Sequence, residues 1–164
     1  MIATTIVLPI ASALIDAQLN IEPFTWAGRV SVDQVLLAAF GKWYVFWAGG
    51  VRLMLAGLRQ SFAPGMTLRQ IFEIDHPPSG HIVQELGFAN ISISLVCLLS
   101  LLYPALMPAG AISAGVFYGL AGLQHIRKRE RNPQRTLAML TDLLVFVVLS
   151  ASITSMMWHR DSLF

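Results

Sequence analysis

The chain has 164 residues, of which 55% are hydrophobic and 12% are charged, and its formal net charge is +2. Its mean hydropathy is +0.65. Soluble domains typically carry about 25% charged residues, so this composition argues against a soluble enzyme and against a disordered chain. The low net charge argues against a nucleic-acid partner. The single cysteine, Cys97, excludes a disulfide framework and a cysteine-rich metal site. The composition therefore predicts a small integral membrane protein, and the lipid bilayer is its expected partner.

Apolar segments long enough to cross a bilayer define the predicted elements, because a spanning helix needs about 20 mostly apolar residues. We predict an all-α membrane helix bundle, a single domain over residues 1–164, with spans at about 2–17, 36–62, 82–103, 107–126 and 136–158. The first segment is short, and no basic residue precedes it as in a signal peptide. It is either an uncleaved span, which gives five, or an interfacial helix beside four spans.

The later segments differ in how clearly they are marked. The segment at 36–62 begins with aromatic residues, as at a membrane interface, but also carries Lys42, Arg52 and Arg59. The turn Tyr103–Pro108 contains two prolines and predicts a tight antiparallel hairpin between the next two spans.

Basic residues in the connections predict the orientation. The connection 127–135 holds Arg127, Lys128, Arg129, Arg131 and Arg135. We therefore expect this connection to lie in the cytoplasm, and the connection 17–35 and the C-terminus to lie on the opposite side of the membrane.

Small residues recur every four positions at Ala111, Gly115 and Gly119. Such a stripe lets a second helix approach closely. It predicts a packing seam, either within this bundle or between two copies of the chain.

Polar residues inside the predicted spans are the candidate functional residues, because polar groups at membrane depth are costly and usually face protein or water. Arg52 is about ten residues, or about 15 Å, from the inner end of its span. The other members of the predicted polar cluster also fall in the cytoplasmic half: Gln84, Glu85, Asn90, His125 and Asp142. We expect Arg52 to pair with Glu85 or Asp142, with Glu85 favoured, and Asn90 and His125 to complete the hydrogen bonds.

Four interpretations of this cluster remain open. It is an ion-pair network that fixes helix register, a ligand or cofactor pocket, a proton or ion path, or a metal site. We favour the first, with no metal and no particular cofactor. A second possible metal site, with Glu73, Asp75, His76 and His81 in the connection before the third predicted span, reads better as an ordinary solvated loop.

Several short patterns between Lys42 and Leu149 belong together: Gly49–Leu53, Ala56–Gln60, Gln84–Asn90, Gly119–Ile126, Asn132–Pro133 and Met139–Asp142. In their order and spacing they resemble a family of small bacterial polytopic membrane proteins of unknown function. A looser similarity is to DoxX-type four-helix membrane proteins. The resemblance implies a membrane fold and a bacterial source, and it implies no activity. With a bacterial source, we expect a location in the inner membrane, with the connection 127–135 in the cytoplasm and the C-terminus in the periplasm.

The leading functional hypothesis is a protein with no catalysis of its own, acting as a structural or accessory subunit of a membrane complex or as a homo-oligomer. One alternative is a small membrane enzyme or redox partner that holds a quinone or lipid-type ligand at Glu85, His125 and Asp142. A second alternative is an oligomeric transporter.

Overall fold

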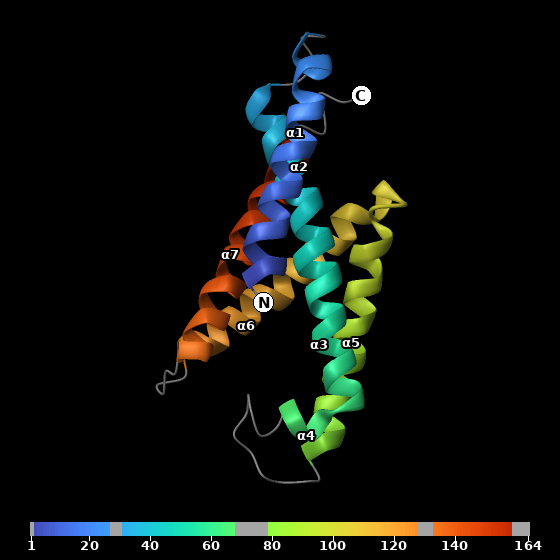
Figure 1. Cartoon of the computed structure of the whole chain (residues 1–164), viewed down its shortest axis with the longest axis vertical. Helices are drawn as coiled ribbons and strands as arrows, with labels where there is room; N and C mark the ends of the chain where they lie inside the picture. Colours follow the sequence, from blue (N-terminus) through green and yellow to red (C-terminus); the bar gives the residue numbers. More distant parts are fainter. Residues whose placement is uncertain (1, 27–30, 68–78, 128–132, 159–164) are drawn as a thin grey trace.

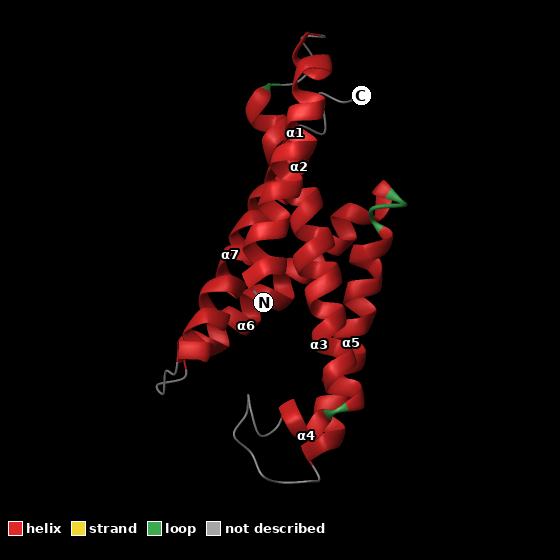
Figure 2. Cartoon of the chain, viewed as in Figure 1, coloured by secondary structure: helices red, strands yellow, loops and turns green. Residues whose placement is uncertain are grey.

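The computed structural model describes residues 2–26, 31–67, 79–127 and 133–158. Within these ranges the chain is helical and has no strand (Figure 2). The all-α prediction is confirmed for the described part of the chain.

Two long helical segments, which we call the first rod and the second rod, form an antiparallel pair at the N-terminal end (Figure 1). The first rod consists of the π-helical turn η1 (Ala3–Val7) and α1 (Leu8–Trp26). The second joins α2 (Val32–Tyr44), the π-helical segment η2 (Val45–Arg52) and α3 (Leu53–Phe62) without a break. Ser31 begins this rod, and its backbone N–H donates to Gln34 Oε1 at 2.9 Å, which satisfies a group that a helix start otherwise leaves unpaired.

Contacts between the two rods fix their register. Lys42 Nζ lies 2.8 Å from Asp16 Oδ2, and Trp47 Nε1 donates to Ser12 Oγ at 3.1 Å. Further along, Arg52 Nη1 donates to Thr5 Oγ1 at 3.3 Å. The first rod therefore begins beside Arg52, and α3 continues past the point where the first rod starts.

The C-terminal half contains three helices: α5 (Gly80–Leu99), α6 (Met107–Arg127) and α7 (Pro133–Trp158). The short helix α4 (Pro64–Thr67) precedes them, and a single 3₁₀ turn, η5 (Pro104–Leu106), joins α5 to α6. The prolines make this hairpin as predicted, because Pro104 opens the turn and Pro108 lies in the first turn of α6, where a missing N–H costs nothing.

A buried core lies where the rods converge. It contains four residues of the second rod (Tyr44, Val45, Ala48 and Leu53), Cys97 from α5, and five residues of α6 and α7: Ala111, Ala114, Tyr118, Val145 and Leu149. Below this core, in the orientation of Figure 1, the helices separate into two pairs. We call them the α3–α5 arm (Leu53–Phe62 with Gly80–Leu99) and the α6–α7 arm (Met107–Arg127 with Pro133–Trp158).

Close approach of small residues holds each arm together. In the α3–α5 arm, a Cβ added at Gly57 would lie 2.8 Å from Gly87 O, so the two backbones touch. In the α6–α7 arm, a Cβ at Gly119 would lie 2.8 Å from Phe146 Cδ2, and one at Gly115 would lie 3.6 Å from Leu149 Cβ. Gly115 and Gly119 of the predicted stripe therefore face α7 within the monomer, and Ala111 is fully buried in the core.

In the part of the chain that the structure describes, four helices are long and apolar enough to cross a membrane: Ala3–Asn20, Gly80–Leu99, Pro104–Arg127 and Thr136–Met157. They correspond to four of the five predicted spans, and the first segment is among them. The predicted span at 36–62 is helical, but it is not one of these four long apolar helices.

Candidate functional site

An ion pair between Arg52 and Asp142 lies at the centre of the molecule, where η2 meets α7. Arg52 Nη2 donates to Asp142 Oδ1 at 2.6 Å. The two side chains are only 13% and 6% exposed, so neither charge reaches solvent freely. Burial of an unpaired charge is costly, and the pair therefore joins the two helices firmly.

Two further groups hold the Arg52 guanidinium in place. Thr5 of η1 is fully buried, and its hydroxyl oxygen accepts from Arg52 Nη1. The ring of Tyr118 on α6 lies 4.9 Å from Arg52 Cζ, a geometry in which the π-face attracts the cation. Tyr118 is oriented in turn by its hydroxyl, which donates to Ala48 O at 2.7 Å. Arg52 thus touches groups from three other helical elements.

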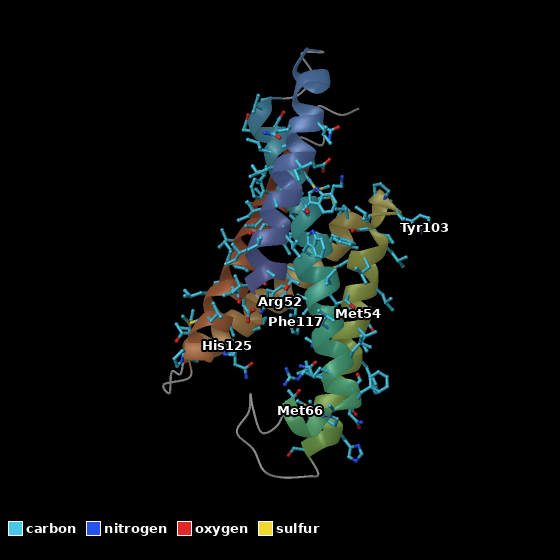
Figure 3. The ribbon with its side chains drawn as sticks, in the orientation of Figure 1. Arg52, Met54, Met66, Tyr103, Phe117 and His125 are labelled. Carbon is cyan, nitrogen blue, oxygen red and sulfur yellow. The ribbon has the colours of Figure 1, made fainter. Side chains whose placement is uncertain are left out.

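His125 lies in the last turn of α6 (Figure 3). Its Nε2 is 3.8 Å from Asp142 Oδ2, too far for a hydrogen bond. Its Nδ1 is buried and has no hydrogen-bond partner among the described residues. Asp142 therefore has a basic group on each oxygen, one in bonding contact and one just beyond it.

A second polar group lies in the α3–α5 arm, separate from the ion pair. Asn90 Nδ2 donates to Gln60 Oε1 at 2.8 Å, and Gln84 Nε2 donates to Ser61 O at 3.2 Å. These bonds run between the same two helices that meet at Gly57 and Gly87. They link α3 to α5, as interhelical hydrogen bonds between membrane helices commonly do.

The structure divides the predicted polar cluster in two. Arg52, His125 and Asp142 come together, whereas Gln84 and Asn90 bond to α3. The expected preference of Arg52 for Glu85 is wrong, because Glu85 is exposed on the outer side of α5. The physical reason is the helical period: Glu85 and Asn90 are about 140° apart around the helix at 100° per residue, and Asn90 takes the buried side. Asn90 therefore does not complete the hydrogen bonds of Arg52 either.

Possible metal ligands are dispersed in the part of the chain that the structure describes, where no three His, Cys, Asp or Glu side chains gather. Cys97 is fully buried, and its Sγ lies 3.5 Å from Gly110 O, which suits a small packing residue. Of the possible loop site, Glu73, Asp75 and His76 lie outside the described residues, and His81 is exposed in the first turn of α5.

Residues 1–161 match a sequence family described as "Family of unknown function (DUF6790)". The chain belongs to this family. The predicted resemblance to an uncharacterised family is thus confirmed and extends over nearly the whole chain. No curated protein and no solved structure matches it, and the similarity to DoxX-type proteins is not shown.

The sequence analysis missed two features of this family member. The first is the support of Arg52 by Thr5 and Tyr118, which read as ordinary members of apolar segments. The second is an ion pair at the far end of the first two rods, where Asp16 Oδ2 accepts from Lys42 Nζ at 2.8 Å and from Trp43 Nε1 at 2.9 Å. An antiparallel hairpin over the connection 17–35 brings Asp16 and Lys42 together, so an explicit register argument could have found this pair.

Proposed function

We propose that the chain is a polytopic inner-membrane protein with no catalysis of its own, which serves as an accessory subunit of a membrane complex or assembles with copies of itself. One observation carries the proposal. Arg52 and Asp142, whose side chains are only 13% and 6% exposed, bond to each other. Polar groups that join helices give a bundle a defined register.

The proposed arrangement has five spans, with the helix at 32–62 as the additional one. This helix runs antiparallel along all of α5: Gly49 lies against Cys97, Gly57 against Gly87 and Ser61 beside Gln84. If α5 crosses the bilayer, the segment 49–62 crosses at the same depth. Its exposed side chains include Leu55 and Phe62, at 59% and 83% exposure, which suits contact with lipid. The connection 127–135 is then cytoplasmic and the C-terminus periplasmic.

Purification of the full chain in a mild detergent tests the proposed role. We expect a colourless sample that elutes above the size of one 18.0 kDa chain with its detergent, either as a homo-oligomer or with a second membrane protein. Crosslinking in intact membranes before extraction serves as the control against dissociation by detergent. A monomer in both experiments would refute the proposal.

A second candidate function, a membrane enzyme or redox partner with a quinone or lipid-type ligand, is favoured by one observation. Nδ1 of His125 is buried without a partner in the described chain, and such an atom is available to a ligand. The exposed position of Glu85 weakens this candidate, because the expected ligand site consists of Glu85, His125 and Asp142. A visible absorbance band, or a quinone in the organic extract of the purified sample, would support the enzyme over the accessory subunit. The remaining alternative, a transporter, requires an oligomer, and its test is flux in vesicles.

A further inference from the structure

One carboxylate of the long apolar helices has no partner within the described part of the chain. These four helices contain three acidic residues, Asp16, Glu85 and Asp142. Asp16 pairs with Lys42, and Asp142 pairs with Arg52. Among the residues that the structure describes, no ion pair includes Glu85. A cation for this carboxylate therefore has to come from outside the described chain.

Glu85 lies on the exposed face of α5. Gly87 and Asn90 are buried and face α3, and Glu85 is two residues from Gly87, about 200° around the helix. Its neighbours on the outer face, Ile82 and Phe88, are 70% and 56% exposed. Close contacts between membrane helices favour small residues, whereas large apolar side chains such as these suit contact with acyl chains.

The depth of Glu85 limits which cations can reach it. The helix α5 has 20 residues, which is about 30 Å and matches the thickness of the hydrocarbon core. Glu85 is five residues, or about 7.5 Å, from the Gly80 end of this helix. Side chains of a helix lean toward its N-terminus, so the carboxylate leans toward the nearer membrane surface. At that boundary, the cations that the bilayer itself supplies are the ammonium groups of phospholipid headgroups.

We propose that the outer face of α5 at Glu85 binds a phospholipid whose headgroup carries a primary ammonium, as in phosphatidylethanolamine. The ammonium donates hydrogen bonds to the carboxylate, and the acyl chains lie against Ile82 and Phe88. A choline headgroup has the same charge but no N–H to donate, so the site distinguishes the two headgroups by hydrogen bonding to an ionised group. The proposal rests on α5 crossing the bilayer and is independent of the accessory role.

Native mass spectrometry of the full chain in a mild detergent measures this binding. The protein is titrated with phosphatidylethanolamine and with phosphatidylcholine of the same acyl chains, and the bound and free peaks give an apparent Kd for each lipid. Glu85→Gln removes the charge and keeps the shape. Asp33→Asn is the matched control, because it makes the same chemical change at an exposed carboxylate in the first turn of α2. The same spectra report the oligomeric state, so failure of the lipid site is distinguishable from failure of the proposed assembly.

We expect the parent to bind phosphatidylethanolamine about tenfold more tightly than phosphatidylcholine, which is the effect of one hydrogen bond to a charged group. Glu85→Gln should bind both lipids equally, and Asp33→Asn should match the parent. Equal affinities in the parent, an unchanged preference in Glu85→Gln, or loss of the preference in both variants would overturn the proposal. Glycerophosphoethanolamine has the same headgroup without acyl chains, and it should not displace the bound lipid at equal concentration. Displacement would assign the site to a free amine and overturn the assignment to a lipid.

Discussion

Removal of one member of the Arg52–Asp142 pair should destabilise the protein far more than removal of both. Asp142→Ala leaves a guanidinium that is 13% exposed without its carboxylate. Breaking a buried pair in this way costs about 3–5 kcal/mol in soluble proteins. Hydrogen bonds between membrane helices are worth less, about 0.6–1.7 kcal/mol. Because the pair is charged and the Arg52 side chain is only 13% exposed, we expect a loss nearer to about 3 kcal/mol for Asp142→Ala and for Arg52→Ala.

The double variant Arg52→Met/Asp142→Leu separates a charge effect from a packing effect. It removes both charges and keeps apolar volume, so we expect its loss to be smaller than the sum of the losses of Arg52→Met alone and Asp142→Leu alone by at least about 2 kcal/mol. The assay is equilibrium unfolding by dodecyl sulfate in mixed micelles, followed by tryptophan fluorescence. Glu85→Ala serves as the exposed-carboxylate control, with an expected change within about 0.5 kcal/mol. Strictly additive losses in the double variant would refute the reasoning.

Three further predictions test the topology and the seams between helices. A reporter that works only outside the cytoplasm should be active when fused after Phe164, and activity of a cytoplasmic reporter there would invert the orientation. Gly119→Leu should lower the free energy of unfolding more than Gly115→Leu does in the same assay, by about 1–3 kcal/mol. A Cβ at Gly119 would lie 2.8 Å from Phe146, whereas a Cβ at Gly115 would lie 3.6 Å from Leu149. Equal losses would mean that the α6–α7 seam relaxes freely. Asn90→Leu should lower the free energy of unfolding by about 1–2 kcal/mol, because Gln60 Oε1 loses the Asn90 donor. No change in stability would show that this hydrogen bond contributes no net stability.

The hydropathy of the sequence was sufficient to predict long apolar helices, but not all of their ends or which faces they bury. The first helix runs to Trp26, past its predicted end at about 17, and the next begins at Val32. The runs that became α5, α6 and α7 are long and apolar, and two prolines mark the hairpin between the first two. Depth estimates placed Arg52, His125 and Asp142 within reach of one another. Depth alone could not rank Glu85 against Asp142, because that choice depends on rotation about the helix axis. The rotation of α5 follows from the contact between Gly57 and Gly87, which forms only in the folded bundle.

No local sequence pattern predicts the π-helical segment η2. Eight residues with wider helical hydrogen bonding rotate Arg52 relative to an ordinary α-helix. Similarly, Thr5 gave no signal, since a single hydroxyl in a short apolar segment is common. Its role depends on the first rod starting level with Arg52, and that register is set by distant contacts such as the one between Ser12 and Trp47.

The separation of Arg52 and Asp142 along the chain has a consequence for biosynthesis. The two residues are 90 positions apart, so at about 5–20 residues per second a ribosome needs about 5–18 s to make the second after the first. Throughout that interval the helix at 32–62 carries a cation whose carboxylate does not yet exist. Thr5, which is synthesised earlier, is the one polar contact of Arg52 already available. Stable packing of this helix therefore awaits the last one, so a ribosome stalled before Asp142 should leave it loosely held and accessible to protease.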